Sequence, residues 1–239
     1  MSKAIIIGAT SGIGSELAKI LSNQGYEVGI LGRREALLAE VAKELPGKSY
    51  VRQLDITVPL EAIGKLNMLI EDMGGVDIIV ISAGIGYIND NLDWPLEENT
   101  INTNVCGFTA MCNVAMKFFL KQGQGQLVGF SSIAAIRGSS GAPAYAASKA
   151  FVSNYLEGLR LWTYKKGLPV TVTEIQPGFV DTALAKGDGL FWVAPTNKAA
   201  RQIYRAIITK QSHAYITRRW RIIAWLIKSF PECIMRKLS

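Results

Sequence analysis

Short apolar runs rich in β-branched residues alternate along the chain with longer amphipathic stretches. The apolar runs predict strands, and the stretches with apolar positions every three or four residues predict helices. Several runs, such as 78–81, are apolar at every position, which is typical of strands buried on both faces. The expected strands are residues 4–7, 27–31, 49–54, 76–82, 126–131, 170–175 and 214–217, and the expected helices are residues 12–23, 34–45, 58–73, 97–121, 143–165 and 194–210.

This alternation predicts an α/β fold, in which βαβ units build a doubly wound parallel sheet covered by helices on both faces. A chain of 239 residues fits one large domain better than two small ones. We therefore expect residues 1–217 to form one domain and residues 218–239 to extend it.

The net charge of +7 is concentrated near the carboxyl end, where residues 218–239 hold six cationic side chains and one acidic side chain. The remaining chain is close to neutral, so a nucleic-acid surface is not expected. The cysteines, Cys106, Cys112 and Cys233, lack the spacing of metal ligands, and we expect no metal site. The first strand leaves no room for a signal peptide, and no run of about 20 apolar residues spans a membrane, so a cytoplasmic location is expected.

A glycine-rich loop, residues 8–14, joins the first strand to the first helix. Glycines allow a tight turn and a close approach to a pyrophosphate, and the helix N-terminus attracts its negative charge. The spacing G-x-x-x-G-x-G differs from the general dinucleotide motif G-x-G-x-x-G. The sequence predicts a dinucleotide site here, formed by Gly8, Thr10, Ser11, Gly12, Ile13 and Gly14.

Two arginines, Arg33 and Arg34, follow the second strand. An acidic residue here binds a ribose 2′-hydroxyl, whereas an arginine suits a 2′-phosphate. We predict NADP(H) as cofactor, with Arg33 as the main contact and Arg34 assisting. The alternative is that both side chains are the solvated start of the next helix.

The expected helix 143–165 places Tyr145 and Lys149 on one face, four residues apart. A nearby ammonium favours the tyrosinate, so Lys149 is expected to lower the pKa of Tyr145 from about 10. Tyr145 could then exchange a proton with a substrate oxygen. Ser132, at the end of the fifth strand, could hold that oxygen by a hydrogen bond.

Taken together, these motifs resemble the short-chain dehydrogenase/reductase family over residues 3–217. The family's glycine motif and its catalytic serine, tyrosine and lysine match the residues above. The strand-four motif Asn-Ala-Gly appears with a serine first, and Ile7 stands where the family usually has Thr or Ser. Further matches are Asp55 and Ile56 at the adenine, Ser82, Ala83 and Gly84 after strand four, the helix asparagine Asn104, and Pro177, Gly178, Val180 and Thr182 after strand six.

The resemblance implies a seven-stranded Rossmann-type sheet in the order 3-2-1-4-5-6-7, with NADPH across the carboxyl ends of the strands. It also implies hydride transfer between NADPH and a carbonyl or alcohol, with Tyr145 as general acid/base and Asn104 holding a water that links Lys149 to solvent. A homodimer or homotetramer is expected. The rival interpretation is a dinucleotide sensor without catalysis.

Residues 183–196 are expected to form a substrate lid. Its apolar residues Leu184, Leu190, Phe191 and Trp192 favour a hydrophobic substrate, such as a ketone, an aldehyde, a 3-oxoacyl group or a steroid-like molecule. These side chains could instead simply pack the loop down. The basic, apolar residues 218–239 could pack on one of three surfaces: the protein's own body, a second subunit in a dimer, or an anionic membrane. In the last case the protein would be a lipid-surface reductase recruited by this segment.

Overall fold

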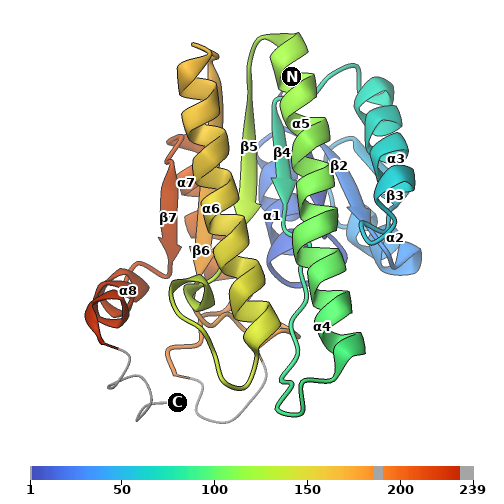
Figure 1. Cartoon of the computed structure of the whole chain (residues 1–239). Coiled ribbons are helices and arrows are strands. Elements are labelled where there is room, and N and C mark those ends of the chain that lie inside the picture. Colours follow the sequence, from blue (N-terminus) through green and yellow to red (C-terminus); the bar gives the residue numbers. More distant parts are fainter. Residues whose placement is uncertain (1, 186–190, 232–239) are drawn as a thin grey trace.

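The computed structural model describes residues 2–185 and 191–231 (Figure 1). Its sheet is parallel and seven-stranded, in the order β3-β2-β1-β4-β5-β6-β7, which confirms the predicted fold class and strand order. The described residues exclude part of the expected lid, residues 186–190 with Leu190 among them, and residues 232–239 of the extension. The strands are β1 (Lys3–Ile7), β2 (Glu27–Gly32), β3 (Ser49–Gln53), β4 (Ile78–Ile81), β5 (Gly125–Phe130), β6 (Val170–Pro177) and β7 (His213–Ile216).

Helices cover both faces of the sheet (Figure 1). The helices α1 (Gly12–Asn23), α2 (Glu35–Lys43) and α7 (Thr196–Ile208) bury their apolar sides in one hydrophobic cluster. The helices α3 (Pro59–Asp72), α5 (Phe108–Gln122) and α6 (Pro143–Lys165) contribute to a second cluster. The sheet separates these two cores, as in a three-layer α/β domain.

The period-two geometry of a strand divides β1 between the two cores. Ala4 and Ile6 lie in the cluster beneath α1, whereas Ile5 and Ile7 lie in the cluster beneath α5. All four side chains are almost completely buried. The run therefore has no polar position, because each face of this central strand is covered.

The predicted helix 97–121 differs from the structure at its start and near its middle. Helix α4 (Trp94–Ile101) begins earlier, with Pro95 in its first turn, where a missing backbone N–H costs nothing. A π-helical segment, η1 (Asn102–Gly107), then joins α4 to α5. Such segments are frequent at functional sites, and this one contains Asn104.

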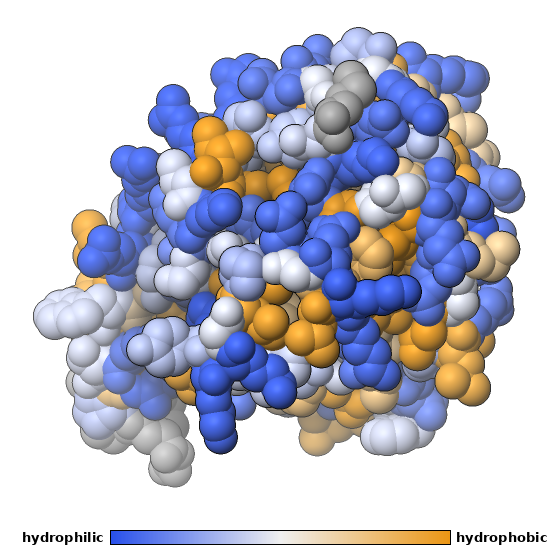
Figure 2. Space-filling model, turned by 90° about the horizontal axis from the view of Figure 1, so that it is seen from above, coloured by the Kyte–Doolittle hydropathy of each residue, from blue (hydrophilic) through white to orange (hydrophobic). Residues whose placement is uncertain are grey.

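Two short elements complete the fold beside the carboxyl end of β7. The 3-10 helix η2 (Ile133–Ile136) follows β5, and α8 (Trp220–Ser229) follows β7 and contacts both η2 and β7. Among the described residues, no helix has the length and apolar character needed to cross a membrane. Figure 2 shows the opposite end of the sheet, where hydrophilic side chains cover most of the surface.

Candidate active site

The segments that carry the predicted site residues follow the strands at the end of the sheet where the parallel strands terminate (Figure 1). The residues come from the segments after the first six strands, β1 to β6, together with η1 and the first turns of α6. The strand order places these segments side by side although they are far apart in sequence. This is the edge at which open α/β sheets bind their ligands.

The glycine loop packs directly against the segment after β4. Gly8 has φ +97°, and a Cβ there would lie 2.5 Å from the backbone nitrogen of Ala83. A Cβ on Gly14 would lie 2.2 Å from the carbonyl oxygen of Gly8 and 3.2 Å from the Ser82 hydroxyl. Both positions therefore require glycine, and Ser82 lies beside the loop.

The N-terminus of α1 has the features of an anion site. Its N-cap residue, Ser11, makes no side-chain capping hydrogen bond, and the first turn contains no acidic residue. The first N–H groups of the helix and its dipole are therefore available to a phosphate. A Cβ on Gly12 would lie 3.2 Å from a methyl carbon of Thr182, so Thr182 lies next to this loop.

Arg34, rather than Arg33, reaches over the glycine loop. Its Nη2 donates hydrogen bonds to the hydroxyl oxygens of Thr10 (2.7 Å) and Ser11 (2.9 Å). Arg33 is also exposed, and its backbone carbonyl accepts a hydrogen bond from Gln53. The geometry thus places Arg34, which was expected only to assist Arg33, at the glycine loop.

Asp55 and Ile56 lie at the far side of the expected cofactor site. One carboxylate oxygen of Asp55 accepts hydrogen bonds from the Thr57 backbone nitrogen (2.9 Å) and hydroxyl (2.8 Å) and so closes a local turn. A Cβ on Gly107 would lie 2.5 Å from the carbonyl oxygen of Ile56. These contacts fix the loop after β3 against η1.

Residues Pro177 to Thr182 lead away from the end of β6. Gly178 lies against the indole of Trp220, since a Cβ there would lie 2.0 Å from the ring. Val180 is buried and pairs with Ala194 in an isolated bridge. The segment just before the expected lid is thereby paired with the last part of that lid.

Ser132 and Tyr145 form a hydroxyl pair at the end of β5. Ser132 caps η2, with its hydroxyl oxygen accepting a hydrogen bond from the Ala134 backbone nitrogen (3.1 Å). Burial raises the pKa of Tyr145 above its usual value of 10, and a hydrogen bond to Ser132 lowers it in part. Gly86 leaves room for the phenol, since a Cβ there would lie 2.6 Å from the Tyr145 ring.

The expectation of a lowered pKa for Tyr145 is wrong, because the pKa of the buried phenol is raised. Lys149 is buried, and its Nζ donates a hydrogen bond to the carbonyl oxygen of Phe130 (3.0 Å). Its Nζ lies 5.8 Å from the centre of the Tyr145 ring, and burial of the phenol is the largest influence on the pKa of Tyr145. Burial also lowers the pKa of Lys149 to about 8, so its ammonium still predominates at neutral pH.

Asn104 joins η1 to the segment after β4. Its Oδ1 accepts a hydrogen bond from the Ile85 backbone nitrogen (2.9 Å), and its Nδ2 donates to the Ile85 carbonyl (2.7 Å) and to the Ser148 hydroxyl (2.9 Å). Ser148 in turn donates to the carbonyl oxygen of Tyr145 (2.8 Å). Gly84 lies between Asn104 and Lys149: a Cβ there would lie 3.0 Å from the Lys149 Nζ and 3.4 Å from the Asn104 Oδ1. The π-helical segment therefore positions Asn104 next to the catalytic helix.

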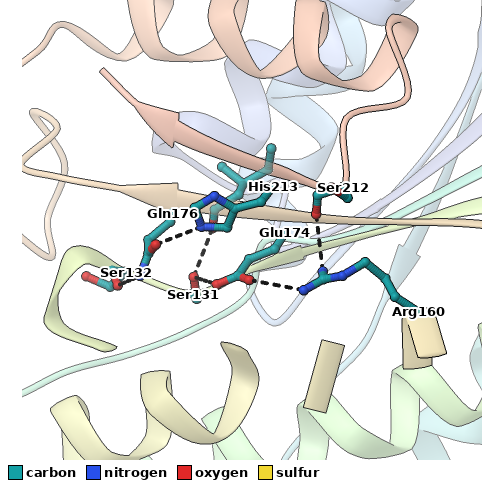
Figure 3. Close-up of polar contacts among 8 residues, drawn as sticks. Ser131, Ser132, Arg160, Glu174, Gln176, Ser212 and His213 are labelled. Carbon is teal, nitrogen blue, oxygen red and sulfur yellow. Dashed lines mark hydrogen bonds and ion pairs between the residues drawn. The ribbon is translucent and has the colours of Figure 1, made fainter. Parts of the chain in front are cut away.

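A buried polar network lies behind Ser132 (Figure 3). Gln176 donates from Nε2 to the Ser132 carbonyl (2.9 Å), so its Oε1 faces His213, whose Nε2–H donates to it (2.8 Å). Ser131 donates to the Glu174 carboxylate (2.6 Å), which also lies 3.7 Å from the Arg160 guanidinium. The backbone after β5 is thus tied to β6 and β7 on both sides.

The sequence prediction missed this network. Glu174 and Gln176 stand two residues apart in a buried strand, and both are nearly inaccessible to solvent. Charged or amide side chains in such a strand need partners, so their presence in the run 170–177 was a usable indication. The identity of those partners depends on β5 and β7, which are distant in sequence.

His213 is expected to make stability depend on pH. Burial lowers its pKa below the usual 6.5, with the Glu174 carboxylate opposing this and Arg160 adding to it. A lowered pKa in the folded state means that the folded protein loses stability as pH falls below about 6.5. His213 is the only histidine in the sequence, so His213→Gln, which keeps an amide donor without titrating, isolates this contribution. Urea unfolding between about pH 5 and pH 8 should show a steeper acid loss for the wild type; equal curves would contradict the assignment.

Comparison with known proteins identifies the class that this fold and site define. The sequence profile described as short chain dehydrogenase matches residues 2–189. An uncharacterized oxidoreductase of Myxococcus xanthus is 36% identical over 186 residues, which cover 76% of this chain and 73% of the relative. The chain therefore belongs to the short-chain dehydrogenase family and is an oxidoreductase; the family uses nicotinamide dinucleotide cofactors.

Solved structures share the fold at lower sequence identity. A 3-ketoacyl-ACP reductase from Sinorhizobium meliloti 1021 superposes with a TM-score of 0.79 and 24% identity, covering 89% of this chain and 96% of that one. An alcohol dehydrogenase from Thermococcus sibiricus, complexed with 5-hydroxy-NADP, has a TM-score of 0.76 and 21% identity, covering 90% of this chain and 95% of that one. Both similarities establish the fold, and the substrate has to be inferred from the residues of the site.

Proposed function

We propose that this chain is an NADPH-dependent reductase of a hydrophobic ketone or aldehyde. The observation that carries the proposal is the convergence of Ser132, Tyr145, Lys149 and Asn104 beside a glycine loop over which Arg34 extends. A dinucleotide sensor without catalysis has no use for a buried lysine and a paired tyrosine–serine hydroxyl.

The residues present fit a dinucleotide. Close backbone packing at Gly8 and Gly14 fixes the tight turn from β1 into α1, and the N-terminus of α1 has no side-chain cap and no acidic residue in its first turn. Arg34 adds a guanidinium fork, which matches a phosphate in shape and charge. When bound, the nicotinamide supplies the hydride; the protein supplies position and proton transfer.

The protein's own groups then act on the substrate oxygen. Tyr145, kept protonated at neutral pH by its burial, donates its proton to the carbonyl oxygen as the carbon is reduced. Ser132 donates a hydrogen bond to the same oxygen. The Lys149 ammonium stabilises the tyrosinate that remains, because the low-polarity surroundings strengthen a charge interaction. The alcohol leaves, and Tyr145 recovers its proton from solvent.

Arg34 is expected to set the choice of cofactor. A charge-assisted phosphate contact contributes roughly 1.5–3 kcal/mol, which corresponds to about tenfold or more in affinity. Arg34→Ala should weaken NADPH binding by about that factor and leave NADH binding nearly unchanged. Arg33→Ala is the matched control and should have the smaller effect. Fluorescence titration of both reduced cofactors measures this, and equal wild-type affinities would rule out the NADPH preference.

Activity itself is tested by a screen of carbonyl compounds, in which NADPH absorbance measures turnover. Apolar side chains at Leu184, Phe191 and Trp192 favour larger hydrophobic ketones and aldehydes over small polar ones. Cofactor binding without turnover on any compound, unchanged by Tyr145→Phe, would instead favour the sensor.

A further inference from the structure

Helix α8 presents an apolar side to solvent as well as an apolar side to the protein. Trp220 and Ala224 lie one turn apart and are only 2% and 1% exposed, so they form the inner side. Ile222 and Trp225 are 65% and 68% exposed, and Leu226 is exposed beside them. These three residues share the opposite side of the helix by their spacing of three and four; we call them the α8 outer face. Packing on the protein's own body therefore accounts for only half of this helix.

Contacts at both ends hold α8 in this orientation. At its carboxyl end, the Arg137 guanidinium donates to the carbonyl oxygens of Ile227 (3.1 Å), Lys228 (3.1 Å) and Phe230 (2.5 Å). A cation here also complements the helix dipole. At its amino end, the Trp220 ring lies 5.2 Å from Phe179, between ring centres. The α8 outer face is therefore fixed toward solvent in the described part of the chain.

The surroundings of the α8 outer face are cationic. Arg218, Arg219, Arg221 and Lys228 are all exposed, and residues 218–231 contain no acidic residue. Within the described residues, none of the ion pairs involves any of these four cations. Exposed tryptophan and isoleucine beside arginine and lysine are typical of helices that lie in the interface of an anionic bilayer.

A second apolar group lies against the same helix. Phe191 and Trp192 are both exposed, and their rings lie 5.2 Å and 6.2 Å from the Trp220 ring, between centres. Arg219 donates from Nη2 to the Trp192 carbonyl (2.8 Å), and its guanidinium lies 4.8 Å from the Trp192 ring centre. The expected lid and α8 thus form a joint apolar and basic edge beside the site.

We propose that the α8 outer face docks on an anionic lipid bilayer, with Arg221 and Lys228 contacting lipid headgroups. A helix of 10 residues is far too short to span a bilayer, but it suffices to bury one apolar side in the interface. A second copy of the chain fits this surface less well, because a two-fold contact would set these cations against each other. Docking places Phe191 and Trp192, next to the site, at the level of the lipid.

The test is co-sedimentation of the full chain with vesicles of phosphatidylcholine, with and without phosphatidylglycerol. We expect binding to the anionic vesicles, weak binding to pure phosphatidylcholine, and release at high salt, because exposed charges are screened. The double variant Ile222→Ser with Trp225→Ser should lose about tenfold or more in vesicle affinity. Leu60→Ser, on α3 and 85% exposed, is the matched control and should bind like the wild type.

A second pair of variants tests the charge separately. Arg221→Glu with Lys228→Glu should abolish the preference for phosphatidylglycerol, whereas Lys117→Glu, on the exposed side of α5, should preserve it. The substituted side chains are exposed, so circular dichroism and melting curves should match those of the wild type.

Three outcomes would overturn the proposal. The wild type could fail to bind anionic vesicles, or it could bind them equally well after Ile222→Ser with Trp225→Ser. Equilibrium sedimentation could also show an oligomer that this double variant dissociates, without vesicle binding, in which case a second copy covers the α8 outer face. Each readout is independent of NADPH and of turnover, so the result stands apart from the proposed reductase activity.

Discussion

Replacing Tyr145 by phenylalanine should reduce turnover by roughly 10²–10⁴-fold, the range typical of a lost general acid. The substitution removes one hydroxyl group and keeps the ring, which packs against Gly86 and faces the Lys149 ammonium. The glycine loop and Arg34 are untouched. Affinity for the dinucleotide should therefore stay within about twofold, since no phosphate contact changes.

Tyr164→Phe is the matched control for this experiment. Tyr164 lies near the end of the same helix, α6, and is 88% exposed. The substitution Tyr164→Phe removes an equivalent hydroxyl group far from the site. Turnover should be unchanged in this variant. Single-turnover measurements at saturating NADPH separate the chemical step from binding. If Tyr145→Phe kept near-normal turnover on a substrate of the wild type, Tyr145 could not be the proton donor.

The sheet could be predicted from the sequence because its strands are buried on both faces. The predicted strands 78–81 and 4–7 have no polar position, and the following helices repeat apolar residues with helical spacing. Such patterns depend on local chain geometry alone, so they are readable without tertiary information. The strand order then followed from the family resemblance rather than from periodicity.

The π-helical segment could not be predicted in this way. Periodicity continues through residues 102–107, and nothing in the local sequence specifies the altered hydrogen bonding. What fixes the position of Asn104 is its pair of hydrogen bonds to the backbone of Ile85, 19 residues away, and its contact with Ser148, 44 residues away. Tertiary contacts of this kind override local propensity.

The candidate site was predictable in its parts and less so in its energetics. Ser132, Tyr145 and Lys149 were found by spacing and resemblance, and the structure brings them together. The direction of the Tyr145 pKa shift was not predicted correctly, because burial of the phenol depends on the whole fold. The spacing of Tyr145 and Lys149 shows only that the two side chains approach each other. The choice between Arg33 and Arg34 likewise depends on where the glycine loop lies.

The glycine loop allows a prediction with an internal control. At Gly14, an added methyl group would lie 2.2 Å from the Gly8 carbonyl oxygen, which belongs to the backbone and cannot rotate away. Gly14→Ala must therefore displace the loop. The free energy of unfolding should fall by about 1–3 kcal/mol, the usual cost of overpacking, and affinity for the dinucleotide should fall at least about tenfold as the phosphate-binding surface moves.

Gly64→Ala makes the same chemical change where space is available. Gly64 lies in the interior of α3, and a Cβ there would meet no atom within 4 Å. Alanine in an exposed helical position should raise the free energy of unfolding by about 0.5–1 kcal/mol, because the unfolded chain loses conformational freedom. Urea unfolding and NADPH titration of both variants check the prediction. We expect the free energy of unfolding to fall in Gly14→Ala and to rise in Gly64→Ala, with cofactor affinity lost only in Gly14→Ala. Equal effects of the two substitutions would show that the packing of Gly14 on Gly8 does not shape the cofactor site.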